Sequence, residues 1–503
     1  MSIDPALRRL ALNTLLAAFP GTTAPGWARD LLADGLAGHT LFGSNVADPE
    51  QLARLTAELR AARPDAVIAI DEEGGDVTRL GHRTGSAYPG NAALGAVDDP
   101  GLTREVYAAI GHELAAAGVT LNLAPDVDVN TAARNPIIGT RAFGAETALV
   151  ARHTGAAVEG LQSAGVAACA KHFPGHGATV TDSHLELPTV DEPLSVLRER
   201  DLPPFAAAIA AGTRAIMSAH IRVPELTGDA PATFSRAALT GLLRGEYGFT
   251  GVIVTDALEM RGAAGTAARA GAAGAGGGRG TEGAAGGGVP RAAVAALAAG
   301  ADLLCVGAVV DRELVEATAG EIAEGVRDGR LPLERFEDAV ERTRGMAGEN
   351  AARQPAGRGP EACGLVAARR ALLVEGDVTA MRKALVVRLV TGHSIAEGRV
   401  PWGLRPFLGG REQIDAVAGE VTPESLIARA GGRPILLVGR RVHQGEATRE
   451  LARGLAAAHP TGVLEMGWPS AWRPAGVRAF LVTHGASLVS ARAAAEALWG
   501  HPE

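Results

Sequence analysis

The 503-residue chain has few cysteines and no long hydrophobic run, and each of these features excludes a class of protein. Its three cysteines, Cys169, Cys305 and Cys363, are far apart and form no CxxC pair. We therefore expect neither a disulfide framework nor a cysteine zinc site, and we expect Cys169 and Cys305, which lie in apolar runs, to pack in a core. Because no uninterrupted apolar segment is long enough to span a bilayer, we expect no membrane-spanning helix.

The chain also lacks an excess of positive charge. It contains 48 lysines and arginines and 56 aspartates and glutamates, which gives a formal net charge of −8. Nucleic acids and anionic membranes attract dense positive surfaces, so neither is expected as the main partner. The composition, 47% hydrophobic and 21% charged, is that of a globular protein, and the length favours two domains.

The N-terminal segment places Arg8 and Arg9 before an apolar run, as a short signal peptide does. No small-residue cleavage site follows the run, however. Residues 12–19 are better explained as a buried first strand that ends at Pro20 and Gly21. We therefore expect the protein to be cytoplasmic.

Short apolar runs alternate with helical stretches through the first two thirds of the chain. The candidate strands are residues 13–19, 40–42, 66–70, 119–123, 167–170, 215–218, 252–255 and 303–306. Continuous apolar strands separated by Ala/Leu-rich amphipathic segments are typical of parallel strands covered by helices. Eight such units within about 340 residues predict an α/β fold of the TIM-like (β/α)8 barrel type.

Two segments with the composition of loops or linkers suggest where the domains begin and end. Residues 262–289 are low-complexity Gly/Ala sequence with almost no apolar side chain larger than alanine, so we expect a loop after the seventh strand. Residues 347–361 have the composition of a linker. We predict a barrel domain over residues 1–346 and, from four further strand-like runs alternating with helical segments, a smaller αβα sandwich over residues 362–503. The second domain carries no glycine fingerprint for a nucleotide.

Ionisable residues recur where the predicted strands end. They are Asp71 after the third strand, Asp126 and Asp128 after the fourth, Lys171 and His172 after the fifth, His220 after the sixth and Asp256 after the seventh. In a (β/α)8 barrel the C-terminal strand ends meet at one rim, where the chemistry takes place. We therefore expect an active site at this rim.

The stretch KHFPGHGATVTDSH, residues 171–184, allows more than one interpretation. His172 and His176 are four residues apart, but the Pro-Gly pair between them prevents a metal-binding helix. A metal site built from His176, Asp182 and His184 is still conceivable, and His172 and His176 could simply brace a turn. Asp182 and His184 can also meet side by side, with the carboxylate accepting the imidazole N–H and raising its basicity, as in a proton-transfer pair.

Three further residues have both a structural and a functional interpretation. Asp256 follows an apolar run and could cap the next helix. Arg79, in DEEGGDVTR, could form an ion pair with Asp71 across a glycine turn, and Arg141, in NPIIGTRAFG, could bind backbone carbonyls. Each structural explanation is reasonable alone, but together they require many polar groups to meet at one rim for unrelated reasons.

Four segments in this order resemble the signature segments of glycoside hydrolase family 3. They are AIDEEGGDVTRL, NPIIGTRAFG, KHFPGHGATVTDSH and GFTGVIVTDALEM. KHFPGHG with the following D-S-H resembles, more narrowly, the β-N-acetylglucosaminidases (β-hexosaminidases) of that family. The resemblance is close over about residues 10–345 and holds only in outline for the αβα-sandwich domain that follows.

The resemblance implies a retaining exo-β-N-acetylglucosaminidase that acts on small glycosides or on cell-wall fragments, as in peptidoglycan recycling. Asp256 matches the nucleophile, His184 the general acid/base and Asp182 the aspartate paired with it. The residues matched to sugar binding are Asp71, Arg79, Arg141, Lys171 and His172. A nucleophile on one face of the sugar and a proton donor near the leaving oxygen are what glycoside cleavage needs, and no metal or organic cofactor is implied.

Two other functions are compatible with the same residues. A phosphorylase would use phosphate in place of water, because an imidazole does not repel an incoming anion as a second carboxylate would. The residues do not distinguish the two acceptors, and we favour hydrolysis. A sugar-binding protein without activity would be expected to lack Asp256, Asp182 or His184, and all three are present.

Overall fold

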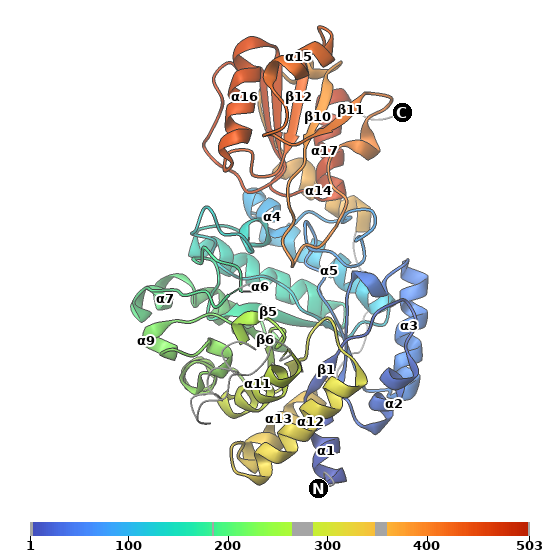
Figure 1. Cartoon of the computed structure of the whole chain (residues 1–503), viewed down its shortest axis with the longest axis vertical. Coiled ribbons are helices and arrows are strands. Elements are labelled where there is room, and N and C mark those ends of the chain that lie inside the picture. The colour runs from blue at the N-terminus through green and yellow to red at the C-terminus, as the bar shows by residue number, and fades with distance from the viewer. Residues whose placement is uncertain (1–3, 184–185, 264–284, 348–359, 501–503) are drawn as a thin grey trace. The chain divides into compact units, whose positions relative to one another are not determined.

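The computed structural model describes residues 4–183, 186–263, 285–347 and 360–500 (Figure 1). Most of the predicted Gly/Ala loop, most of the predicted linker and His184 lie outside these ranges. The boundary predicted at residues 347–361 therefore stays a prediction. No helix within these ranges is both long and apolar enough to cross a membrane.

The first described sheet is a parallel barrel, which confirms the predicted TIM-like fold (Figure 1). Its strands are β1 (Leu15–Ala17), β2 (Gly38–Leu41), β3 (Val67–Ile70), β4 (Leu121–Asn122), β5 (Ala167–Phe173), β6 (Ala215–Ser218), β7 (Val252–Thr255) and β8 (Leu304–Cys305). Each strand from β1 to β6 pairs with the next in the chain, and β8 pairs with β1. A parallel bridge between Val254 and Leu303 joins β7 to the β8 segment and brings the two ends of the sheet together.

Helices before, between and after the barrel strands cover their outer faces. They are α1 (Pro5–Leu12), α2 (Gly26–Asp34), α3 (Pro49–Ala62), α5 (Pro100–Ala116), α6 (Thr147–Ser163), α7 (Leu194–Arg200), α8 (Pro203–Ala210), α9 (Pro224–Thr227), α11 (Ala285–Ala299), α12 (Arg312–Arg327) and α13 (Leu333–Ala347), with a π-helical segment at Ala237–Glu246. In α3, the side chain of Asp48 accepts a hydrogen bond from the Gln51 amide, and Pro49 occupies the first turn. Leu52, Leu55 and other apolar residues at helical spacing form its buried face.

Side chains from alternate strand positions fill the barrel interior. This core includes Leu16, Val67, Ala69, Leu121, Leu123, Ala167, Cys169, Ala215, Met217, Val252, Val254, Leu303 and Cys305. Neighbouring strand residues such as Leu15, Ile68 and Ile216 are equally buried on the opposite side of the strands. Burial on both sides explains why the strands are continuous apolar runs rather than alternating ones.

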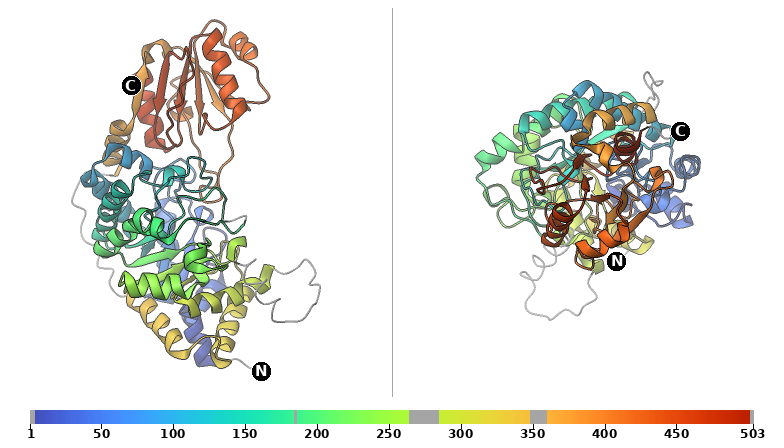
Figure 2. Two further views of the ribbon diagram at one scale, coloured as in Figure 1. Left: turned by 90° about the vertical axis from the view of Figure 1, so that its left-hand side faces the viewer. Right: turned by 90° about the horizontal axis from the view of Figure 1, so that it is seen from above.

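The C-terminal segment forms the predicted αβα sandwich (Figure 2). Its strands are β9 (Leu373–Gly376), β10 (Leu385–Leu389), β11 (Gln413–Ala416), β12 (Ile435–Gly439), β13 (Thr461–Glu465) and β14 (Ala479–Val482), in the order β11-β10-β12-β13-β14-β9. Only β9 is antiparallel to its neighbour among these strands. The helices are α14 (Pro360–Ala371), α15 (Pro423–Ala430), α16 (Glu446–Ala458) and α17 (Leu488–Trp499), and separate apolar clusters pack α17 and the α15–α16 pair against the sheet.

Two loops that follow barrel strands belong, by their contacts, with the sandwich. One compact unit comprises Met1–Glu72, Thr103–Ile137 and Ala145–Ala356, and the other comprises Glu73–Leu102, Ile138–Gly144 and Gly357–Glu503. In the second unit, helix α4 (Asn91–Val97) packs against α14. Asp76 Oδ1 accepts a 2.9 Å hydrogen bond from the amide of Ala486, and Ser86 O accepts one of 3.0 Å from that of Leu488.

Candidate active site

Strand β5 carries two of the predicted site residues within the strand itself. The sequence predicts its end at residue 170, but it continues through Lys171 and His172 to Phe173. The prediction is wrong here because the polar Lys171–His172 pair continues the strand instead of ending it. Phe173 extends the strand by packing its ring against Phe205, with centroids 5.2 Å apart, and the register shifts between Ala170 and Phe173.

Lys171 and Asp71 form an ion pair at the C-terminal rim of the barrel. The Lys171 Nζ lies 2.7 Å from Asp71 Oδ1, and their side chains are 2% and 19% exposed. Asp71 follows directly after β3, whereas Lys171 lies on β5. The pair places a cation with several donors beside a partly exposed acceptor, an arrangement suited to sugar hydroxyls.

His172 is held by a buried carboxylate from the β4 side. Its Nδ1 lies 2.7 Å from Asp128 Oδ2, and Asp128 Oδ1 accepts a 2.6 Å hydrogen bond from the amide of His176. Burial alone would raise the pKa of Asp128, but the imidazoles of His172 and His176 and the backbone N–H of His176 outweigh it, and the pKa lies below its ordinary value. This carboxylate therefore stays ionised and fixes the orientation of the His172 ring.

Asp126, Asp128 and His172 bring three metal-ligand atoms within 4.8 Å of one another. The 2.7 Å separation of Asp128 Oδ2 and His172 Nδ1 is a hydrogen-bond distance. Two ligands bound about 2.1 Å from one tetrahedral metal would lie more than about 3 Å apart. The geometry is therefore that of a hydrogen-bonded pair.

His176 braces the loop that follows β5, as the turn-bracing interpretation predicts. Its Nδ1 lies 2.6 Å from Thr179 Oγ1, and its Nε2 lies 3.2 Å from Ser183 Oγ. All three side chains are buried. Since both ring nitrogens face hydroxyl groups, neither is directed towards the metal site considered with Asp182 and His184.

Asp256 follows β7 and is half-buried at the rim. Its Oδ1 accepts a 2.8 Å hydrogen bond from the amide of Ala257, and its own amide donates to Ser218 O at 3.1 Å. The next helical residues begin at Arg261, so Asp256 does not occupy the helix-cap position that the sequence leaves open. A carboxylate held in this way at a strand end is suited to attack a bound substrate.

His220, the ionisable residue expected after β6, is fully buried. Its Nε2 lies 3.1 Å from Ala257 O and its Nδ1 lies 2.9 Å from Thr233 Oγ1. It therefore supports the backbone next to Asp256 from within the protein. Glu259, which sequence reasoning missed, also supports this loop, because its Oε1 accepts from the amide of Ala308 beyond β8 at 2.6 Å.

Arg141 and Arg79 lie in the second compact unit. Arg141 makes a buried two-point ion pair with Glu73, from Nε to Oε2 at 2.9 Å and from Nη2 to Oε1 at 2.7 Å. Arg79 Nη2 donates to Ala396 O at 3.0 Å. Sequence reasoning did not find Glu73, although it stands in the quoted IDEEGG segment. The Arg141 guanidinium thus binds a carboxylate, a partner other than the backbone carbonyls that the structural interpretation names. Two parallel hydrogen bonds of this kind fix the plane of the guanidinium.

Asp182, the last described member of the predicted proton-transfer pair, is half-buried. Its carbonyl accepts a 3.2 Å hydrogen bond from the amide of Glu186. Because His184 lies outside the described residues, the pairing of the two side chains stays a prediction.

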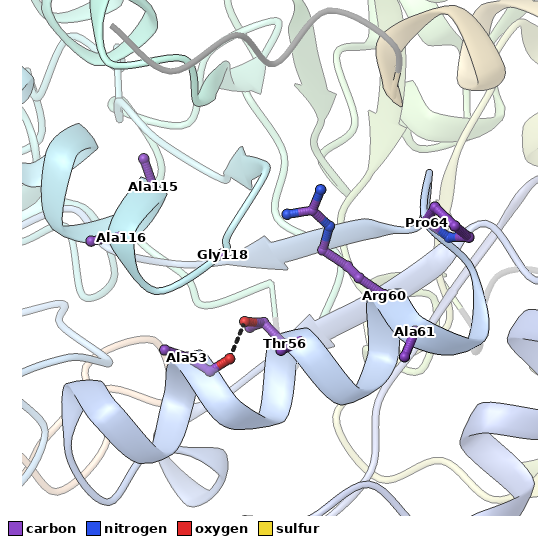
Figure 3. Close-up of a pocket in the computed structure, with 9 residues that line it drawn as sticks. Ala53, Thr56, Arg60, Ala61, Pro64, Ala115, Ala116 and Gly118 are labelled. Atoms are coloured by element: carbon purple, nitrogen blue, oxygen red, sulfur yellow. Dashed lines mark hydrogen bonds between the residues drawn. The ribbon is translucent and has the colours of Figure 1, made fainter. Parts of the chain in front are cut away.

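A cavity of about 490 Å³ opens on the outside of the barrel between α3 and the end of α5 (Figure 3). It is lined mainly by small residues, among them Ala53, Thr56 and Ala116, with Arg60 as the charged member. These helix ends precede β3 and β4, so the cavity lies at the N-terminal end of the strands. It contains none of the rim residues and does not belong to the candidate active site.

The sequence and the fold both match known glycosidases. The model of the glycosyl hydrolase family 3 N-terminal domain matches residues 23–345, so the chain belongs to this family and to the class of glycoside hydrolases. Beta-hexosaminidase A of Pseudoalteromonas piscicida is 38% identical over 263 residues, 48% of this chain and 44% of that protein. A beta-hexosaminidase of Xanthomonas axonopodis pv. citri is 40% identical over 266 residues, 51% of this chain and 78% of that protein.

A solved structure matches almost the entire chain. The glycoside hydrolase family 3 beta-N-acetylglucosaminidase from Paenibacillus sp. str. FPU-7 superposes with a TM-score of 0.83 at 30% identity, over 99% of this chain and 97% of that one. The match includes both the barrel and the sandwich.

Proposed function

We propose that the chain is a retaining exo-β-N-acetylglucosaminidase that hydrolyses terminal N-acetylglucosamine from small glycosides or cell-wall fragments. The observation that carries this proposal is the arrangement at the barrel rim, where Asp256 follows β7 and the Lys171–Asp71 pair joins β5 to β3. Relatives named as beta-hexosaminidases and the Paenibacillus beta-N-acetylglucosaminidase structure support the choice of sugar.

In the first step, the Asp256 carboxylate attacks the anomeric carbon of the bound sugar. A C–O bond to the carboxylate forms while the glycosidic C–O bond breaks, and the leaving oxygen takes a proton from the His184 imidazolium. In the second step, water replaces the carboxylate at the anomeric carbon and gives its proton to neutral His184. Asp182 accepts the imidazole N–H and favours the charged form.

The other rim residues bind and orient the terminal sugar. Lys171 donates to hydroxyl oxygens, and Asp71 accepts from hydroxyl groups. The Asp128 carboxylate fixes the His172 ring at 2.7 Å, so that the ring presents one edge to the substrate. By their match to the family's segments, Arg79 and Arg141 are also assigned to sugar binding.

The first experiment distinguishes water from phosphate as the acceptor. Turnover of p-nitrophenyl N-acetyl-β-glucosaminide is measured with and without phosphate, and the sugar product is identified. Free N-acetylglucosamine at an unchanged rate supports the hydrolase. A phosphate-dependent rate with N-acetylglucosamine 1-phosphate as product would show the phosphorylase instead, a reaction that an imidazole acid/base permits.

Covalent trapping tests the nucleophile. A 5-fluoro N-acetylglucosaminyl fluoride should form a stable ester that mass spectrometry of peptides locates on Asp256, because the ring fluorine slows both steps while the fluoride leaving group keeps formation of the ester faster than its hydrolysis. Asp256→Ala should be unlabelled and inactive but folded. Labelling of another residue would overturn the nucleophile assignment, and no labelling of a folded protein would support the sugar-binding alternative.

A further inference from the structure

The loop after β5 is fastened at two points by one buried imidazole. The His176 Nδ1 lies 2.6 Å from Thr179 Oγ1, and Nε2 lies 3.2 Å from Ser183 Oγ. Between these hydroxyls the chain bulges outward, with the Val180 side chain 70% exposed and Asp182 half-buried. The three residues between the two hydroxyls, which include Asp182, therefore form a bulge. His176 holds both ends of this bulge inside the protein.

The hydrogen-bond pattern assigns the tautomer of the ring. The Thr179 hydroxyl donates its only proton to His176 O at 2.9 Å, so towards the ring it can only accept. His176 therefore carries its proton on Nδ1, and Nε2 accepts from the Ser183 hydroxyl. Burial lowers the pKa of His176 to about 4, which keeps the ring neutral near pH 7.

His176 itself is fixed to the barrel. Its amide donates to Asp128 Oδ1 at 2.6 Å, and its carbonyl accepts from Asn135 Nδ2 at 3.0 Å. A Cβ on the next residue, Gly177, would come within 2.0 Å of Val129 O, so the backbone lies tightly against the segment after β4. His176, which holds the bulge, is thus itself held by the barrel.

The far end of the bulge reaches towards the loop of the proposed nucleophile. The carbonyl of Ser183 accepts a 3.4 Å hydrogen bond from the amide of Gly262, six residues after Asp256. Ser183 also follows Asp182 directly in the chain. Anchoring Ser183 therefore determines where Asp182 stands relative to the loop after β7.

We propose that His176 and Ser183 are positioning residues that hold the proton-donating segment in place, acting through Asp182 rather than touching the substrate. This inference rests on the proposed function of Asp182 and its partner as the acid/base. It assigns His176 a part in the proton-transfer step, in addition to a turn-bracing role.

The test uses Ser183→Ala in the full-length protein, with Val180→Ala on the same bulge as the matched control. Each variant is assayed on p-nitrophenyl N-acetyl-β-glucosaminide, whose leaving group needs no protonation, and on N,N′-diacetylchitobiose, whose leaving group does. Ser183→Ala should lower kcat/KM for chitobiose by about tenfold or more, and for the aryl glycoside by less than about threefold. Inhibition by free N-acetylglucosamine and the melting temperature should stay close to wild type, and Val180→Ala should change neither rate.

His184→Ala, assayed on the same two substrates, separates failure of this inference from failure of the proposed function. If His184→Ala shows the leaving-group difference and folded Ser183→Ala does not, the positioning role is overturned and the acid assignment stands. If His184→Ala affects both substrates equally, the acid assignment itself is wrong and the positioning role falls with it. Should Ser183→Ala fail to fold, Ser183→Cys replaces it, and the same selective loss is required.

Discussion

Lys171 Nζ lies 2.7 Å from Asp71 Oδ1 and so connects β5 to the end of β3 across the intervening strand β4. The lysine is only 2% exposed, and this carboxylate compensates its charge. The pair therefore serves both the stability of the rim and, in the proposed function, the recognition of sugar hydroxyls.

Lys171→Met should weaken substrate binding and destabilise the protein. Removing the ammonium group breaks this ion pair, and breaking a buried pair costs on the order of 3 kcal/mol. Urea unfolding and the KM for the aryl glycoside measure the two effects. Asp71→Asn and the double variant complete a cycle, in which additive losses would contradict the coupling.

Arg141→Lys should raise KM although the charge is kept. An ammonium group cannot reproduce the two parallel hydrogen bonds to Glu73, so the orientation of the side chain is lost. We expect a rise of about tenfold or more, with a smaller change in kcat. Arg29→Lys, at the exposed Arg29–Glu58 pair, is the matched control and should leave KM unchanged. Equal KM values for wild type and Arg141→Lys would contradict the role.

The protein should lose stability as the pH falls from about 6.5 to about 4. Burial lowers the pKa of His39 and of His176 to about 4, below the ordinary value near 6.5. In this window the unfolded chain binds protons that the folded protein excludes, and each histidine contributes a loss on the order of 3 kcal/mol. Urea midpoints measured between pH 7 and pH 4.5 follow the effect.

His39→Gln provides the comparison for that pH series. Burial raises the pKa of Asp201 to about 6, which acts in the opposite direction as the pH falls, so the difference between wild type and His39→Gln isolates the histidine. The variant should lose less stability on acidification than the wild type. If the free energy of unfolding changed with pH in parallel for the two proteins, His39 would have the same protonation state in the folded and unfolded protein across this pH range, which would contradict the prediction.

Removal of metal ions should leave activity unchanged. Asp126, Asp128 and His172 are grouped like metal ligands, but the Asp128–His172 contact is a hydrogen bond. Turnover is compared before and after dialysis against a chelator, and again after addition of zinc or magnesium. A loss that the metal restores would show that this group, or the stretch around His184, binds a cation.

The strands of the barrel could be predicted closely because burial on both faces makes each one a continuous apolar run. Strands β6 and β7 lie at the predicted bounds, whereas β5 runs further than its apolar residues indicate. Strands β9 and β11 were not predicted, since both are edge strands and all of β9 is exposed, so neither has a strong apolar pattern.

The partners of the site residues were harder to predict than the residues themselves. Glu73 and Arg141 are 68 positions apart, and Asp128 and His172 are 44 apart, so only the folded chain brings each pair together. Asp71, Lys171 and Asp256 could be located because strand ends converge in any barrel of this type. The role of Ser183 depends on the tautomer of a buried ring, which no local sequence pattern records.

The Asp128 carboxylate binds the ring of His172 with one oxygen and the amide of His176 with the other. A single side chain thus links a residue proposed to contact the sugar with the base of the loop proposed to carry the acid. Mutations near Asp128 would then alter specificity and proton transfer together. Adaptation to a new sugar would then proceed more readily through residues remote from this carboxylate, such as those on the loop that follows β3.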